Sequence, residues 1–283
     1  MSASAAPRSR RLRLRLEFDG ALFCGWQLQS EIHEVEKSSV QGEVERALGV
    51  YLRSSSRVVI QGCGRTDAGV SAREFYAHFD LPESSLAELD LEKFRHGLNG
   101  ILPEGIAVLR VDRVRADFHA LRDVTRKTYE YTLLLRRAKP TLERTSAYWV
   151  PETLSTFRIE KLREALKRIE GRHDFVAFAA SDHTAQTTVR EIYEACAEVR
   201  ALVGHDDPLE GALIHLRFTG EGFLKQMVRT LAGTLVEVGQ GKRDLDSILR
   251  LLSGEASRSE AGPCAPPHAL RLLSVFYEGQ GTS

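Results

Sequence analysis

The chain has 283 residues, which is enough for one large domain or for two lobes with a substantial core. Its 42% hydrophobic and 28% charged residues are typical of a soluble protein, and no apolar run approaches the length of a membrane span. The 39 basic and 39 acidic residues cancel. This balance argues mildly against a nucleic-acid-binding protein, although a cleft needs only a local excess of Lys and Arg.

Residues 1–10 are small, polar and basic, and no apolar segment follows them. We therefore expect a disordered tail here and not a secretory signal. The four cysteines are widely scattered, and neither they nor the nine histidines have the spacing of a metal site. Reduced thiols in the cytosol and no metal are the expectation. The sequence also has no G-x-S-x-G segment, so a serine hydrolase has no support.

The first half of the chain predicts alternating strands and helices. Residues 11–18 alternate polar and apolar side chains, as a half-buried strand does. Apolar residues at helical spacing predict helices over 40–52 and 90–102. Between and after these helices we expect a strand-like run at 58–60 and strands over 73–79, 106–114 and 127–135.

A Pro- and Thr-rich segment, 140–151, is a candidate lobe boundary. Beyond it we expect a helix over 159–169, strands over 188–203 and 212–218, helices over 222–238 and 244–252, and a strand over 270–277. Leu14, Leu16, Phe18, Gly20 and Phe23 have counterparts 200 residues later at Ile214, Leu216, Phe218, Gly220 and Phe223. This echo predicts two related α+β lobes, at 11–140 and 151–278, that share a sheet with a cleft near its middle.

The stretch Gly62-Cys63-Gly64-Arg65-Thr66-Asp67-Ala68-Gly69-Val70 holds three glycines in eight residues, so its backbone can turn sharply and approach a ligand. One interpretation is a tight turn in which Asp67 or Thr66 caps its own backbone. A phosphate-binding loop is poorly supported, because Val70 stands where that motif needs a lysine. The dinucleotide fingerprint fails because its third glycine would fall on Asp67.

A third interpretation makes Asp67 a catalytic nucleophile. Arg65 lies two residues before it, and a nearby guanidinium favours the ionised carboxylate that a nucleophile needs. Tyr129 lies on an expected strand, where it is either a core residue or a platform for an unstacked base. Lys225 and Arg229 are four apart on an expected helix, so they form either a solvated basic edge or, through Arg229, a partner for Asp67 or a phosphate.

The segment 64–70 resembles the signature of the tRNA pseudouridine synthase A family. Further motifs follow in the order of that family over residues 11–277: Phe18–Gln27, Val40-Gln41, Leu98-Asn99, Leu102-Pro103, Phe118–Ala120, Arg126–Tyr131, Gly171–Phe175, Gly222–Arg229 and Ala265–Pro267. Ser71 stands where bacterial members usually carry His, and Ala269 and Arg271 also depart from the family pattern. These departures bear on the choice of substrate more than on the reaction.

The resemblance implies an α+β fold of two pseudo-symmetric lobes that share a mainly antiparallel sheet with helices packed on it and a central RNA-binding cleft. It implies a homodimer that isomerises uridine to pseudouridine in the anticodon stem-loop of tRNA, at positions 38 to 40, without metal or organic cofactor; the cysteines place it in the cytoplasm. By the same resemblance Asp67 is the nucleophile, Arg65 opens the RNA, Tyr129 contacts the target uridine and Arg229 pairs with Asp67. The alternative is a non-catalytic RNA-binding protein on the same fold, against which Asp67 and Arg65 argue.

Overall fold

The computed structural model describes residues 11–28, 37–82, 89–202 and 211–278. The expected disordered tail at 1–10, and the last residue of the strand expected over 188–203, lie outside these ranges. The described residues form two units, 11–125 with 274–278, and 126–273. The lobe limits expected from the sequence, 11–140 and 151–278, stay a prediction. Within the described ranges, no helix has the length and apolar character that crossing a membrane requires.

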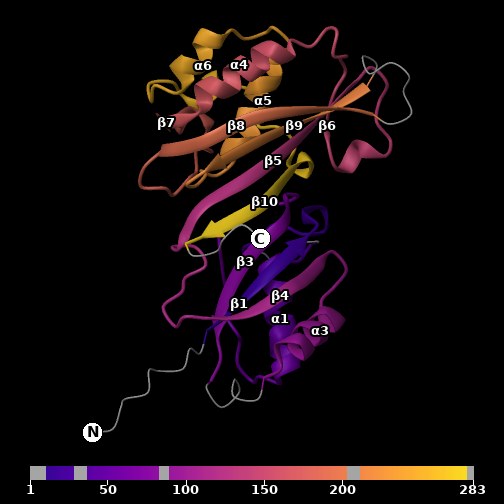
Figure 1. Ribbon diagram of the computed structural model, residues 1–283, viewed down its shortest axis with the longest axis vertical. Coiled ribbons are helices and arrows are strands. Elements are labelled where there is room, and N and C mark those ends of the chain that lie inside the picture. The colour runs from indigo at the N-terminus through magenta and orange to yellow at the C-terminus, as the bar shows by residue number, and fades with distance from the viewer. Residues whose placement is uncertain (1–10, 29–36, 83–88, 203–210, 279–283) are drawn as a thin grey trace. The chain divides into compact units, whose positions relative to one another are not determined.

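The first unit is a sheet with two helices (Figure 1). Its strands follow the order β4-β1-β3-β10, and β2 pairs with β3. β1 pairs antiparallel with β3 and β4, and β2 pairs antiparallel with β3. The bounds are β1 Arg11–Phe18, β2 Gln61–Gly62, β3 Ser71–Asp80 and β4 Ile106–Val114. The alternation of β1 buries Leu12, Leu14 and Leu16 completely, as its sequence predicts.

Two helices complete this unit, α1 (Val40–Leu52) and α3 (Leu91–Ile101), and they contact each other. The Ser39 side chain caps α1 by accepting from the Gly42 N–H, and Asp90 caps α3 by accepting from the Glu92 and Lys93 N–H groups. The α3 helix contacts β4 and buries Phe94 and Leu98.

The second unit also combines a sheet with helices. Its strands follow the order β10-β5-β9-β8-β7, with antiparallel pairs between β5, β9, β8 and β7 and a parallel pair between β5 and β6. Their bounds are β5 Val124–Arg136, β6 Tyr148–Val150, β7 Gly171–Asp174, β8 Val189–Ala201 and β9 Gly211–Gly220. Figure 1 shows the helices of this unit along one side of β8: α4 Ile159–Ile169, α5 Met227–Gly239 and α6 Leu245–Leu251.

The last strand, β10 (Leu270–Tyr277), belongs to both units. Its first four residues, 270–273, lie in the second unit, and 274–277 lie in the first. The Tyr277 hydroxyl donates to the Ala120 carbonyl at 2.7 Å, and its ring lies edge-on to Tyr76. The mixed α+β class with a mainly antiparallel sheet and packed helices is confirmed; the central RNA-binding cleft stays a prediction.

The run 58–60 is not a strand, and the strand begins only at Gln61. The reason lies in the partners of Ile60. Its N–H donates to the Glu45 carboxylate at 3.1 Å, and its carbonyl accepts from the Gln41 side chain at 3.2 Å. Two side chains from α1 thus take the hydrogen bonds that a neighbouring strand would make.

The expected helix over 222–238 begins only at Met227. Gln226 takes a left-handed conformation with φ 62°, which an interior helical residue does not adopt, and so the helix cannot extend further toward residue 222. The sequence reasoning also missed the short strands β6 and β7. The first lies inside the segment taken as a lobe boundary, and the second was read only as the end of the preceding helix.

Candidate active site

Asp67 lies in the loop 62–70 between β2 and β3. The Val70 N–H donates to the Asp67 carbonyl at 3.1 Å and closes a tight turn, in which Gly69 takes φ 81°. The Asp67 side chain is half-buried and Arg65 is exposed. The backbone therefore makes the expected tight turn, but the Thr66 hydroxyl does not cap it, because among the described residues this buried hydroxyl has no hydrogen-bond partner.

The entrance to the loop is fixed on β3. Cys63 is fully buried, its N–H donates to the Tyr76 carbonyl at 2.7 Å, and its sulfur accepts from the Tyr76 N–H at 3.5 Å. Cys63 is thus a structural residue whose backbone and side chain both hold the loop against the neighbouring strand.

The backbone of the segment 20–26 packs directly against the backbone of the loop. The Trp26 N–H donates to the Thr66 carbonyl at 3.2 Å. Gly25 has φ 110°, and a Cβ there would lie 2.7 Å from the Thr66 carbonyl oxygen. A Cβ on Gly20 would lie 2.2 Å from the Val70 carbonyl. Only glycine fits at either position, so the opening motif of the chain sets the path of the residues on both sides of Asp67.

Ser71, one of the departures from the family pattern, ties the start of β3 to the same support. Its hydroxyl accepts from the Gly20 N–H at 3.0 Å and donates to the Asp19 carboxylate at 3.4 Å. That carboxylate also accepts from the Ala21 N–H at 3.0 Å. A single hydroxyl therefore links the exit of the loop to the 19–21 turn.

Tyr129 lies on β5, opposite Phe218 of β9, and is half-buried. Its ring contacts Phe223 edge-on, with 5.0 Å between ring centroids. Tyr131, two residues on, is completely buried, and its hydroxyl donates to the Pro266 carbonyl at 2.9 Å. The two tyrosines lie on the same strand, two residues apart, but they differ in burial. Tyr131 is a core residue, whereas Tyr129 keeps part of its surface exposed.

Arg229 lies in the first turn of α5 and is half-buried. Its Nε donates to the Ala265 carbonyl at 2.8 Å, and the Ala265 N–H donates to the Arg229 carbonyl at 3.2 Å. Lys225 precedes the helix and forms an ion pair of 2.6 Å with Asp182. The prediction that Lys225 and Arg229 share a helical face is wrong, because the left-handed Gln226 separates them.

The predicted site residues divide between the units. Asp67 and Arg65 belong to the first unit, and Tyr129 and Arg229 belong to the second. The roles assigned to these four stay predictions. The sequence reasoning gave no role to Gly25, although a glycine next to a large aromatic residue, in a motif shared with a family, is a signal of close backbone packing.

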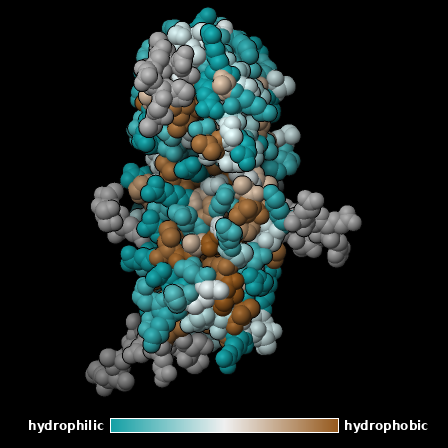
Figure 2. All heavy atoms as spheres, turned by 90° about the vertical axis from the view of Figure 1, so that its right-hand side faces the viewer, coloured by the Kyte–Doolittle hydropathy of each residue, from teal (hydrophilic) through white to brown (hydrophobic). Residues whose placement is uncertain are grey.

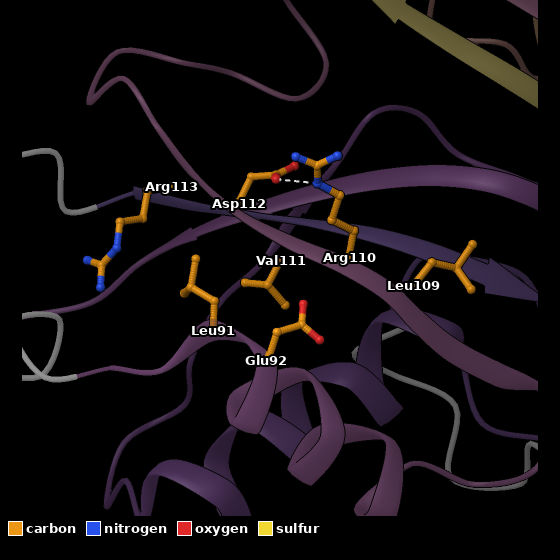
Figure 3. Close-up of a pocket in the computed structure, with 7 residues that line it drawn as sticks. All are labelled: Leu91, Glu92, Leu109, Arg110, Val111, Asp112 and Arg113. Atoms are coloured by element: carbon orange, nitrogen blue, oxygen red, sulfur yellow. Dashed lines mark hydrogen bonds and ion pairs between the residues drawn. The ribbon is translucent and has the colours of Figure 1, made fainter. Parts of the chain in front are cut away.

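A hollow in the first unit is lined by none of the loop residues just described (Figure 3). It is lined by Leu91, Glu92, Leu109, Arg110, Val111, Asp112 and Arg113, from α3 and β4. Arg110 points toward Asp112 and pairs with it at 2.6 Å. Asp112 also pairs with Arg13 at 2.8 Å. Because the carboxylate already has two cations, we assign no chemistry to this hollow.

The exposed surface of the first unit carries both apolar and charged side chains. Hydrophobic side chains gather in the lower half of the face in Figure 2, over the first unit. None of the exposed large hydrophobic residues in the described ranges belongs to the loop 62–70, whose exposed residues include Arg65 and Ala68. Across those same ranges, no group of three or more His, Cys, Asp or Glu side chains is arranged to hold a metal ion.

Comparison with known proteins assigns the chain to a protein family. Residues 165–278 match the family model described as tRNA pseudouridine synthase. Over 268 residues the chain is 38% identical to tRNA pseudouridine synthase A of Geobacter sp. (strain M21), covering 95% of this chain and 99% of that protein. The protein of the same name from Streptococcus mutans is also 38% identical, with the same coverage, and that from Geobacillus kaustophilus is 36% identical over 96% of both chains. The chain belongs to the tRNA pseudouridine synthase A family, and its α+β fold is that of the family.

Proposed function

We propose that this protein is an isomerase that converts uridine to pseudouridine in the anticodon stem-loop of tRNA. The similarity over nearly the whole chain to proteins named tRNA pseudouridine synthase A supports the substrate and the reaction. The observation that carries the proposal within the molecule is the loop around Asp67. This loop holds the half-buried Asp67 two residues after the exposed Arg65, on a backbone that β3 and the segment 20–26 fix.

The reaction rearranges bonds without net oxidation. The N1–C1′ bond of the uridine breaks, the base rotates, a C5–C1′ bond forms, the C5 proton passes to solvent and N1 ends protonated. Such chemistry needs an ionised carboxylate near the ribose and base, and cations that hold the nucleotide after it leaves its stack. No external energy source or redox partner is required.

Four residues take roles in this proposal. Asp67 is the nucleophile, and the exposed Arg65, two residues before it, helps to open the RNA and place the base. Tyr129 contacts the target uridine, for which its half-exposed ring is suited. Arg229 supplies the positive charge that pairs with Asp67, and its hydrogen bonds with Ala265 fix the start of its side chain.

The proposed assembly and surroundings follow the family. We infer a homodimer that acts on tRNA in the cytoplasm, with no membrane, metal or organic cofactor involved. Analytical ultracentrifugation of the protein with and without tRNA measures the dimer directly, and a single species at 31.6 kDa would contradict it.

The test of the activity is tritium release from transcript tRNA labelled at C5 of uridine, with wild type and Asp67→Ala compared side by side. We expect release by wild type and none by the variant, with circular dichroism and tRNA affinity unchanged, because Asp67 lies in a loop and not in the core. Turnover by Asp67→Ala would refute its assignment as nucleophile. Binding of tRNA by wild type without any release would favour the alternative, a non-catalytic RNA-binding protein.

A further inference from the structure

Two polar side chains are buried inside the first unit, one helical turn apart on α1. Gln41 and Glu45 each keep only 6% of their surface exposed. Burying an amide and a carboxylate is costly unless each of their polar atoms finds a partner. Here the Gln41 Nε2 donates to the Glu45 Oε1 at 3.0 Å, so the pair forms a single unit. The pair makes two further sets of hydrogen bonds, one to Ile60 just before the loop 62–70 and one to the segment 26–28, which contacts the loop.

The first set of hydrogen bonds joins the pair to Ile60, just before the loop. Ile60, which is 1% exposed, donates its N–H to Glu45 and accepts from Gln41 through its carbonyl. The next two residues form β2, and Cys63 follows with its hydrogen bonds to β3. The Gln41–Glu45 pair therefore fixes the backbone just before the loop, at a residue that belongs to none of the strands in the described ranges.

The second set of hydrogen bonds joins Gln41 to the segment 26–28, which contacts the loop. The Gln41 side-chain oxygen accepts from the Gln27 side chain at 3.0 Å and from the Leu28 N–H at 3.1 Å. Its backbone N–H donates to the Trp26 carbonyl at 3.0 Å. Trp26 in turn donates to the Thr66 carbonyl, next to Asp67. One glutamine thus holds both the entrance of the loop and the segment on which it rests.

We propose that Gln41 and Glu45 are positioning residues for the catalytic loop. Neither touches the reacting atoms. They act by fixing residue 60 and residues 26–28 relative to each other, so that the backbone on both sides of Asp67 keeps one path. This proposal rests on the proposed function for its effect on turnover, but the order of the loop can be measured without any activity.

The experiment compares variants of the full chain. Gln41→Met keeps the side-chain volume and removes every side-chain hydrogen bond of Gln41, and Glu45→Met does the same at Glu45, including the contact with the Ile60 N–H. The matched control is Arg57→Ala. It removes the exposed ion pair of 2.6 Å to the other Glu45 oxygen and leaves the contacts with Ile60 intact.

Two readouts are measured at a temperature at which every variant is folded. Hydrogen exchange is followed in peptides covering 61–70 and, for comparison, 11–18 of β1. Single-turnover tritium release at saturating tRNA is measured together with tRNA affinity. For Gln41→Met we expect faster exchange in 61–70 alone and a release rate lower by about tenfold to a hundredfold, with unchanged tRNA affinity, since a shift of about 1 Å can cost that much. Glu45→Met should change both readouts in the same direction as Gln41→Met, and Arg57→Ala should stay close to wild type.

Two results would overturn the proposal. One is a folded Gln41→Met protein with wild-type exchange in 61–70. The other is an equal rise of exchange in both peptides, which would mean that the pair stabilises the whole unit and does not position the loop. If Gln41→Met does not fold, the milder Gln41→Asn, too short to span Leu28 and Ile60, should change the same readouts in the same direction. A wild type without turnover would refute the proposed function, while the exchange data would still decide this one.

Discussion

The replacement of Gly25 by alanine tests how closely the loop rests on its support. Gly25 has φ 110°, where an L-residue is strained by about 1–3 kcal/mol. The added Cβ would also lie 2.7 Å from the Thr66 carbonyl oxygen and 3.2 Å from the Asp67 carbonyl carbon, so the loop must move. Taking about 2 kcal/mol for the total, we predict a melting temperature lower by about 4–8 °C for a protein of this size.

The matched control is Gly49→Ala. Gly49 lies within α1, and a Cβ there meets no atom within 4 Å. Alanine should stabilise this helix by about 0.5–1 kcal/mol. Thermal unfolding followed by circular dichroism gives both shifts, and tritium release at a temperature below both transitions gives the activity. We expect Gly25→Ala to lose activity even where it is fully folded, and Gly49→Ala to keep it.

A Gly25→Ala protein that matches wild type in melting temperature and in tritium release would show that the loop does not rest on residue 25. An equal loss in Gly49→Ala would be as damaging, because it would mean that any added methyl group in this unit disturbs the fold. Loss of stability without loss of activity would separate the strain at Gly25 from the position of Asp67, and would refute the second part of the reasoning.

Two further predictions concern other contacts. Burial lowers the pKa of His78 to about 4, below its unfolded value of about 6.5, so the unfolded chain binds a proton that the folded one does not. The free energy of unfolding should therefore fall as the pH drops from 6.5 toward 4. Urea unfolding at pH 7 and pH 5 measures this fall, which should be smaller in His78→Asn than in wild type. A fall of the same size in both proteins would contradict the prediction. Tyr131→Phe removes the hydrogen bond to the Pro266 carbonyl, next to the residue that holds Arg229. It should lower the free energy of unfolding by about 1 kcal/mol and slow tritium release; a wild-type rate would show that the 265–266 segment does not depend on Tyr131.

Elements whose burial follows a regular period were predictable. The alternation over 11–18 gave β1, and the apolar spacing over 90–102 and 159–169 gave α3 and α4. Local caps were predictable as well, since Asp244 accepts from the Ser247 N–H at the start of α6. In each case the signal lies within a few residues of the element, which is why one sequence sufficed.

What escaped prediction depends on distant residues or on a single dihedral angle. The partners of Ile60 lie on α1, 15 and 19 residues earlier, so the run 58–60 looked like a strand without being paired as one. The residues around Gln226 carry no sequence signal for a left-handed backbone conformation, so the start of α5 was predicted too early. The candidate site follows the same rule: its loop was visible as a motif, but the backbone contacts that support it were not.

The strand β10 has a consequence for how the protein is made. The first unit carries the loop with Asp67, yet its sheet includes residues 274–277, near the far end of the chain. Until the ribosome has released these residues, Ala120 has no Tyr277 hydroxyl to bind, and the rings of Tyr76 and Phe118 lack their neighbour. The unit synthesised first is thus the one completed last, and a chain cut short of its final strand cannot finish the domain that carries the proposed nucleophile.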